Sequence, residues 1–430
     1  MKTFIVILAL LITAPLSAQD SSQKKNGSSV WLKGNIHTHT FWSDGNQFPE
    51  MIAKWYKQEG YDFLALTDHN VLSKGEKWMP LSTLKARGGD DILEKYIAAF
   101  GDEWVITRGE EPKLEVRLRT LEEFRQGLEK DGDFLMIQSE EISDRSQGVP
   151  VHMNATNIQE VIAPLGGATV REAMANNLRA VAEQARRTGK PIILHLNHPN
   201  FGYAVTAEDL AAVVQERFVE IYNGHPGVNV LGDDDHASVE KIWDIANTIR
   251  LAQLSAFPLF GIGTDDSHHY HGRGTSRPGR SWIMVRGDKL EPDAITETIS
   301  RGDFYSSSGV TLKDVVFDNK KRVLSLQIEA EVGVTYSTRF IGTTKTADLS
   351  SKEKKAANGK TVTRIYSEDV GAVLSTVSGT NPRYEFKGDE LFVRAVVTSS
   401  KAHVDPTLPN QTEQAWTQPV GWSVSSRRSR

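Results

Sequence analysis

The sequence predicts an α/β fold with a mostly parallel sheet, followed by a small antiparallel β domain. Between about residues 30 and 310, short apolar runs alternate with amphipathic, helix-length stretches, which is typical of parallel sheets, open or closed into a barrel. Over residues 311–424 the apolar period changes to two, and turn signals separate the runs. At 430 residues the chain exceeds one ordinary domain, so two are expected.

The first 18 residues have the layout of a secretory signal peptide. Lys2 precedes an apolar run from Phe4 to Ile12, and small residues follow up to Ala18. The run is shorter than the ~20 apolar residues that span a bilayer. We expect cleavage after Ala18 and a flexible polar tether over residues 19–29. The expected product is an exported protein, periplasmic or secreted, with no transmembrane segment; an uncleaved membrane anchor is the alternative.

Composition limits the partners and the stabilising chemistry. The net charge is -5 and no basic stripe occurs, so a long nucleic-acid polymer is not expected as a partner. The absence of cysteine excludes disulfides, thiolate metal ligands and a lipid-anchored cysteine. Residues 425–430 are interpreted as a basic tail. Nothing in the sequence indicates the oligomeric state.

The first helix–strand pair of the α/β region lies just after residue 48. Pro49 suits the first turn of a helix and Gly60 its end. Residues 62–67 form a short, mostly apolar run that predicts a buried strand. The apolar residues of this helix share one face: Met51, Ile52, Trp55 and Tyr56.

A second helix is delimited by its capping signals. Thr169 and Glu172 have the spacing of a capping box, and Gly189 marks the helix end. Residues 191–196 follow as a predicted strand. Helices and strands recur along the chain: a helix over 237–250 before a strand over 258–263, and a strand over 282–285 before a helix over 292–301.

Two further regions have their own patterns. Residues 71–133 form a long charged stretch that includes the predicted helices 91–100 and 121–129. In the C-terminal part, residues 324–332 alternate apolar and polar, and residues 391–397 form another strand-like run. This part contains only His403 among the histidines, so we expect it not to be catalytic.

Histidine and carboxylate residues gather in short patches, and eleven of the twelve histidines lie between His37 and His271. Several patches directly follow predicted strands, and the carboxyl ends of parallel strands open onto one face. His37 and His39 are two residues apart, so on a strand both point to the same side. The patches are therefore expected to converge. In order they are His37-Thr38-His39, Ser43-Asp44-Gly45, Thr67-Asp68-His69-Asn70, Glu140-Glu141, His152, His195 to His198, and Asp265 to His268.

Imidazole and carboxylate together are ligands of zinc, manganese and iron. The inventory predicts two or three divalent cations, which would lower the pKa of a bound water and stabilise charge on attacking and leaving oxygens. The Gly-x-Ser-x-Gly and Gly-x-x-x-x-Gly-Lys motifs are absent, so neither a serine nucleophile nor a phosphate-binding loop is expected. Metal-dependent hydrolysis is the chemistry that these residues suit.

The ordered motifs resemble those of the polymerase and histidinol phosphatase (PHP) family of metal-dependent phosphoesterases. This resemblance implies a distorted (β/α)7 TIM-like barrel over residues 30–310, with two or three metals at its carboxyl face, followed by the antiparallel β domain over 311–424. Compact members lack the 71–133 insertion, which is expected to form a lid or side wall. The motifs are His-Thr-His-Thr-Phe-Trp-Ser-Asp-Gly (37–45), Leu-Thr-Asp-His-Asn (66–70), Ser-Glu-Glu-Ile-Ser (139–143), Val-His-Met-Asn-Ala (151–155), Asn-His-Pro (197–199) and Thr-Asp-Asp-Ser-His (264–268).

Carried over position by position, the resemblance implies nine metal ligands, five of them also expected to act in catalysis. The metal ligands are His37, His39, Asp44, His69, Glu141, His152, His198, Asp266 and His268. The catalytic subset is His37, His39, His69, Asp266 and His268.

Some assignments have alternatives. Glu141 is preferred to Glu140 because it precedes Ile-Ser, His198 to His195 because a proline follows, and Asp266 to Asp265 because it stands two residues before His268. An ordinary turn is the alternative for Asp44, and a buried structural role for His152. Asp68 is expected to bond to the neighbouring loop or to a ligand histidine rather than to a metal.

Substrate contacts are expected from the arginines of the glycine-rich loop after the last patch, with a solvated basic loop as the alternative. Phe41 and Trp42 either stack on the substrate or wedge the barrel mouth. Histidines without a motif are expected to be loop or surface residues. The arginines are Arg273, Arg277 and Arg280; the histidines are His225, His236, His269 and His271.

The function predicted is that of an exported metal-dependent phosphoesterase, acting on a small phosphorylated substrate. Metal-bound hydroxide would hydrolyse a phosphate mono- or diester by in-line attack. An amidohydrolase-like metal hydrolase is one alternative, although no strand-end lysine stands where that superfamily carries a bridging one. A non-catalytic protein that binds a phosphorylated ligand is the other.

Overall fold

The computed structural model describes residues 30–271, 274–355 and 361–424. The expected signal peptide, tether and basic tail, and Arg273, lie outside these residues. No helix within the described ranges is long and apolar enough to cross a membrane.

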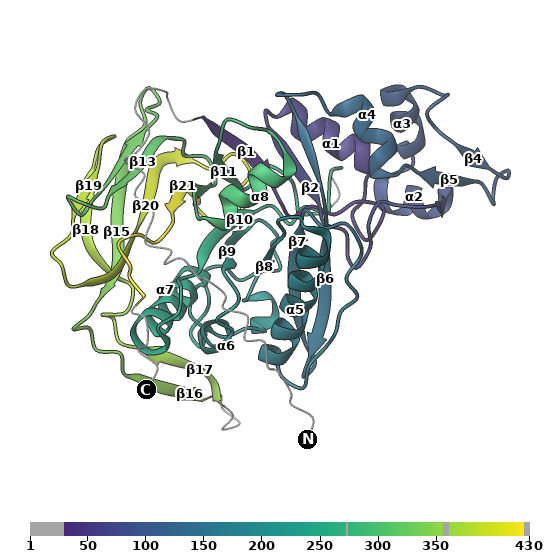
Figure 1. The fold of residues 1–430 in the computed structure, drawn as a ribbon. Helices are drawn as coiled ribbons and strands as arrows, with labels where there is room; N and C mark the ends of the chain where they lie inside the picture. Colours follow the sequence, from purple (N-terminus) through teal and green to yellow (C-terminus); the bar gives the residue numbers. More distant parts are fainter. Residues whose placement is uncertain (1–29, 272–273, 356–360, 425–430) are drawn as a thin grey trace, which may run out of the picture.

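A mixed α/β fold is built on one large sheet of thirteen strands (Figure 1). Seven of them form its α/β half, and only β7 runs antiparallel to the others. A parallel bridge between Thr38 and Ser267 joins the segments that follow the two outer strands of this half, β1 and β10. The seven strands in sheet order are β1 (Trp31–Asn35), β2 (Phe63–Leu66), β6 (Leu135–Ser146), β7 (Val149–Thr156), β8 (Ile193–Leu196), β9 (Phe218–Asn223) and β10 (Phe260–Thr264).

The helices connect these strands as expected, with one exception. β6 and β7 are joined by the two residues Gln147 and Gly148, where seven regular β/α units would need a helix. Both residues have positive φ, 52° and 84°, as a type I′ hairpin turn requires, so the chain returns antiparallel. The helices and short helical turns are α1 (Pro49–Gln58), α5 (Val170–Thr188), η2 (Phe201–Tyr203), α6 (Ala207–Ala212), α7 (Val239–Ile249), η3 (Arg250–Leu254) and α8 (Pro292–Ser300).

Local capping signals set the ends of α5 as predicted. The Thr169 side chain accepts a hydrogen bond from the Glu172 amide, and the Glu172 carboxylate accepts one from the amide of Ala168. Gly189 ends the helix in the left-handed conformation. The apolar residues enclosed by the strands form one buried cluster, which includes Ile36, Phe63, Ile137, Ile193, Phe218 and Ile262.

The 71–133 insertion forms a side wall with a sheet of its own, visible beside α1 in Figure 1. It packs on Phe41, Trp42 and Phe48, which are buried, so Phe41 and Trp42 belong to the core and are not free to stack on a substrate. Its elements are β3 (Lys77–Pro80), α2 (Leu81–Gly88), α3 (Ile92–Phe100), β4 (Thr107–Arg108), β5 (Glu115–Leu118) and α4 (Leu121–Leu128).

The C-terminal part is antiparallel, as its sequence predicts, but its larger sheet continues that of the α/β half. β11 pairs with β1, and β12 pairs with both β11 and β21. The sheet therefore crosses the expected boundary at residue 310 without a break. β14 ends at Ile328, and Val332 beyond it is fully exposed, so the apolar alternation predicted to residue 332 overshoots the strand.

A separate apolar core lies between this continuation and a three-stranded sheet of β13, β14 and β19. The strands of this half are β11 (Trp282–Arg286), β12 (Phe304–Ser307), β13 (Leu312–Asp318), β14 (Val323–Ile328), β15 (Tyr336–Thr344), β16 (Ser351–Lys355), β17 (Thr361–Tyr366), β18 (Ala372–Ser378), β19 (Arg383–Glu385), β20 (Glu390–Ala402) and β21 (Thr412–Thr417).

A buried ion pair joins the two halves. Arg394 of β20 donates from Nε and Nη2 to the two carboxylate oxygens of Asp244 on α7, both at 2.7 Å. Glu240 Oε2 forms an ion pair with Arg394 Nη1 at 3.0 Å. Both members of the main pair are almost completely buried. The pair therefore fixes α7 against the C-terminal strands.

Asp244→Ala is expected to lower the free energy of unfolding by about 3 kcal/mol, because it leaves a buried guanidinium without its main partner. The value lies at the lower end for such pairs since Glu240 remains. Unfolding in guanidinium chloride, monitored by circular dichroism, measures the free energy of unfolding. Glu331→Gln, in an exposed pair with Lys401, is the control and should change stability by less than about 1 kcal/mol. Equal, small effects of both variants would contradict the prediction.

Candidate metal centre

The structure brings all nine predicted ligands together at the carboxyl end of the α/β strands. His37 and His39 follow β1, and the turn after them carries Asp44; His69 follows β2. Glu141 lies in β6 and His152 in β7. These strands pair antiparallel, with Glu141 opposite Asn154. The remaining three follow β8 and β10: His198, Asp266 and His268.

The first group of ligand atoms surrounds one point between β1, β6 and β10. Asp266 Oδ1 lies 3.2 Å from His37 Nε2 and 3.3 Å from His39 Nε2, and Glu141 Oε2 lies 3.5 Å from His39 Nε2. Ligands at ~2.1 Å from a tetrahedral ion are ~3.4 Å apart. The spacing is therefore that of atoms that surround a cation.

Two further groups share residues with the first. Glu141 Oε1 lies 3.0 Å from His152 Nδ1 and 3.5 Å from His198 Nε2. On the solvent side, Asp44 lies 3.4 Å from both His69 and His268. Each of several such sets of three or four residues has ligand atoms within 4.8 Å of one another and could hold an ion. Glu141 belongs to more than one of these sets.

Three buried atoms support a cation at the first group. His37 Nε2, His39 Nε2 and Glu141 Oε2 are inaccessible to solvent and make no hydrogen bond, although Glu141 Oε2 lies in an ion pair 2.6 Å from His69 Nδ1. An unsatisfied buried polar atom costs about 1–3 kcal/mol. These atoms face one another, and a divalent ion would satisfy all three at once. The residues present thus fit a metal centre.

The two buried carboxylates are ionised. Burial raises the pKa of Glu141, but His152 and His69 outweigh this effect and hold the pKa well below its usual value. Burial likewise raises the pKa of Asp266, and neighbouring imidazoles such as His37 bring it well below the usual value. Both groups are therefore in the state that binds metal.

The histidines differ in protonation. Burial, together with the neighbouring His268 and His69, lowers the pKa of His39 to about 3, so its ring is neutral. Burial also lowers the pKa of His69, but Glu141 and Asp44 outweigh it and raise the pKa to about 11. His69 must therefore release a proton when it binds a metal.

Glu220 in β9 contacts the predicted ligand His37 and was not expected from the sequence. Its Oε1 lies 2.6 Å from His37 Nδ1 and accepts a hydrogen bond from Thr264 Oγ1, while its Oε2 accepts from the amide of His198. A proton held on Nδ1 by Glu220 would leave the Nε2 of His37 available to a metal in the first group. The available signal was a single carboxylate within a mostly apolar strand, Phe218–Asn223.

The carboxylates next to the ligands hold loops. Asp68 accepts hydrogen bonds from the Thr40 amide and hydroxyl and from the Ser43 hydroxyl, which confirms the prediction that it bonds to the neighbouring loop. Asp265 accepts from the amides of residues 279–281 and stays outside the ligand groups.

Two ligands have a strained backbone. Asp266 has φ of 48° and His198 has φ of 21°, values in the left-handed region that non-glycine residues rarely adopt. Each such residue costs about 1–3 kcal/mol and is typical of functional sites. Gly45 follows Asp44 where any side chain would collide with the carbonyl of His39, so the turn needs a glycine.

Two of the expected substrate arginines, Arg277 and Arg280, donate to acceptors within the protein, and a role for them in substrate binding stays a prediction. Arg277 donates to both carboxylate oxygens of Asp405. Arg280 is buried and donates to Asp405 and to the carbonyls of Gly224 and Thr275. Since these donors are used within the protein, we do not assign Arg277 or Arg280 to phosphate binding.

The rim of the site contains a histidine and an aromatic residue that the sequence did not single out. His225, expected to be a loop or surface residue, lies in the loop after β9; it is half-buried, and its ring centre lies 5.4 Å from that of His268. Phe201, 36% exposed, lies 5.1 Å from His198 and 6.3 Å from His225 between ring centres. Both rings thus lie beside the predicted ligands His198 and His268.

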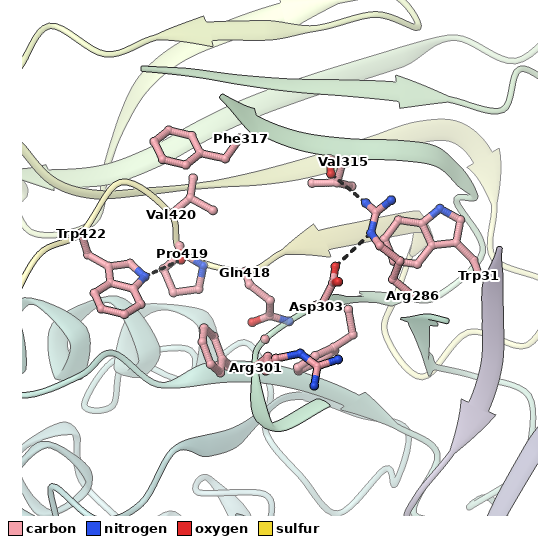
Figure 2. A pocket seen from close by; sticks show the side chains of 13 residues that line it. Trp31, Arg286, Arg301, Asp303, Val315, Phe317, Gln418, Pro419, Val420 and Trp422 are labelled. Carbon is pink, nitrogen blue, oxygen red and sulfur yellow. Dashed lines mark hydrogen bonds and ion pairs between the residues drawn. The ribbon is translucent and has the colours of Figure 1, made fainter. Parts of the chain in front are cut away.

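A separate hollow lies at the other end of the strands. Figure 2 shows Trp31, Arg286, Asp303 and Trp422 around a cavity of about 90 Å³, where Arg286 pairs with Asp303. Trp31 begins β1 and Arg286 ends the antiparallel β11, so this cavity is remote from the carboxyl ends that carry the ligands. It is not part of the metal centre.

No protein-family model matches the chain, and no curated protein matches it significantly. Among solved structures, the chain is similar to a two-domain protein from Bacteroides vulgatus described as containing a PHP-like metal-dependent phosphoesterase, with 14% identity, 94% of this chain and 99% of that chain covered, and a TM-score of 0.39. It is also similar to a protein from Bifidobacterium adolescentis described as a metal-dependent phosphoesterase (15% identity, 63% and 96% covered, TM-score 0.30). A third is an amidohydrolase from Chromobacterium violaceum with bound sulfate and no metal (12% identity, 62% and 96% covered, TM-score 0.28). At these TM-scores the similarities decide neither fold nor activity.

Glu220→Gln is expected to weaken zinc or manganese binding by about 10–100-fold, because its amide nitrogen would face donors that now bond to a carboxylate oxygen. Isothermal titration of the metal-free protein measures the affinity. Glu160→Gln, in an exposed pair with Arg187, is the matched control. Wild-type affinity in Glu220→Gln would show that Glu220 does not orient His37.

Proposed function

We propose that the chain is an exported metal-dependent phosphoesterase that hydrolyses mono- or diesters of a small phosphorylated substrate. Its centre would hold two or three divalent ions, of zinc, manganese or iron. The supporting observation is the set of ligand atoms spaced for cations, among which three buried atoms make no hydrogen bond: His37 Nε2, His39 Nε2 and Glu141 Oε2. Export is proposed from the layout of residues 1–18.

When bound, such ions lower the pKa of a coordinated water and neutralise charge on phosphate oxygens. The residues of this chain hold the ions and shape the space above them. Glu141, shared between groups, would keep two ions close together. Asp44, about half exposed, marks the side from which substrate enters. Phe201 and His225 would restrict water at that opening and contact the leaving group.

Arg145 is proposed to bind an anionic part of the substrate in place of Arg277 and Arg280. It lies on β6, and alternation along the strand puts it on the same face as Ser143 and Glu141. It is exposed, and the one hydrogen bond described for its guanidinium is a long one of 3.4 Å to the Gly148 carbonyl. Four residues span ~13 Å of strand, so the guanidinium could reach a second group of a substrate held at the metals.

Two alternatives are less well supported. An amidohydrolase-like centre would use a bridging lysine, and within the described residues no lysine pairs with Glu141, Asp44 or Asp266. A protein that only binds a phosphorylated ligand would not need three overlapping groups of ligand atoms. The products distinguish the three functions: a phosphoesterase releases phosphate, an amidohydrolase-like enzyme releases ammonia or an acid, and a binding protein releases no product.

Chelation is expected to abolish hydrolysis of p-nitrophenyl phosphate or bis(p-nitrophenyl) phosphate, and manganese or zinc to restore it. The double variant His37→Ala, His39→Ala should lose metal and at least about 100-fold of the rate, since it removes two ligands of the first group. Metal analysis and p-nitrophenol release on the same samples measure both effects. His236→Ala, outside the ligand groups, is the control. Full activity after complete metal removal would refute the proposal.

Arg145→Ala is expected to raise KM about 10-fold for a substrate with a second anionic group while kcat changes little. The lost contact would stabilise the bound substrate and the transition state equally. For p-nitrophenyl phosphate, which has no such group, KM should stay near that of the wild type. Arg186→Ala, an exposed residue of α5, is the control. An unchanged KM for every doubly anionic substrate tested would remove Arg145 from the site.

A further inference from the structure

The C-terminal segment between β20 and β21, residues 403–411, returns to the carboxyl end of the α/β strands. His403 Nε2 lies 3.0 Å from the carbonyl oxygen of Arg280. Gln411 Nε2 donates to the hydroxyl of Tyr222, the residue before the end of β9, at 2.7 Å. Leu408 packs against the apolar cluster of Val228, Val230 and Val239. A segment from the C-terminal half thus contacts the loops that surround the metal centre.

Asp405 within this segment binds two guanidinium groups. It accepts from Arg277 Nε at 2.9 Å and from Arg280 Nε at 3.1 Å. Arg280 is only 2% exposed, and its Nη1 donates to the carbonyls of Gly224 at 2.7 Å and Thr275 at 2.5 Å. Arg280 therefore connects Asp405 to the end of β9 and to the residues that follow the last ligands.

Those following residues hold the ligands Asp266 and His268 in place. Ser276 Oγ donates to the Asp266 carbonyl at 2.5 Å, and the Ser276 carbonyl accepts from the His268 amide at 3.0 Å. The Arg280 amide itself donates to Asp265 at 2.6 Å. Asp266 has the strained φ of 48°, so its conformation depends on bonds of this kind.

We propose that Asp405 is a positioning residue of the metal centre: through Arg280 it holds the backbone that presents Asp266 and His268. This inference rests on the proposed metal centre. Loss of the carboxylate would leave the buried Arg280 charge without its acidic partner, and the guanidinium would move toward solvent. The Gly224 and Thr275 contacts would then loosen, and the two ligands with them. The C-terminal half would in this way contribute directly to metal binding.

The test compares Asp405→Asn with Glu331→Gln, which removes an exposed carboxylate in the same C-terminal half. Titration of the metal-free proteins with zinc or manganese should give a Kd about 10-fold weaker for Asp405→Asn and an unchanged Kd for Glu331→Gln. Hydrogen exchange of metal-free protein should rise at residues 265–271 in Asp405→Asn alone. Asp405→Glu, which keeps the charge, should recover most of the affinity.

Unchanged Kd and unchanged exchange at residues 265–271 in Asp405→Asn would overturn the inference. Should the wild type bind no metal, the proposed function fails, while the exchange measurement on metal-free protein still decides whether Asp405 holds this backbone. Should Asp405→Asn unfold, Asp405→Glu and Arg280→Lys are compared instead. A gain in exchange spread over the whole C-terminal half, without enrichment at 265–271, would also count against positioning.

Discussion

The ionised carboxylate of Glu141, buried among histidines, is the constraint on which the site depends. Its oxygens lie within 3.6 Å of nitrogen atoms of His37, His39, His69, His152 and His198. Burying an ionised carboxylate costs several kcal/mol unless opposite charge and hydrogen bonds compensate. The five imidazoles come from segments that follow or form β1, β2, β7 and β8, so only a sheet whose strand ends converge can supply them.

The surrounding structure maintains this arrangement at some cost in stability. His198 and Asp266 are held in the left-handed region, and Glu220 occupies a buried position where an apolar residue would pack without cost. Asp68 and Asp265 use their carboxylates on loop backbone rather than in the centre. A bound cation would offset part of this loss of stability, because it would coordinate buried atoms that make no hydrogen bond.

The C-terminal half is integrated with the α/β half rather than appended to it. The large sheet continues from β1 through β11 and β12 into β21, and the Asp244–Arg394 pair joins α7 to β20. The segment that contains Asp405 reaches the loop of the last ligands. A single continuous sheet makes relative movement of the halves costly, so the candidate metal centre stands on a sheet that both halves share.

Local pattern was enough for the mixed α/β class, for the ends of helices such as α5 and for the series of patches after strands, because periodicity and capping act over a few residues. It also allowed nine candidate ligands to be named that the structure brings together, although their role as ligands stays a prediction. Tertiary structure decided the rest. Arg277 and Arg280 are paired with Asp405, more than a hundred residues away, and Glu220 meets His37 through the sheet order. Such pairings depend on which strands lie side by side, and no local pattern records that.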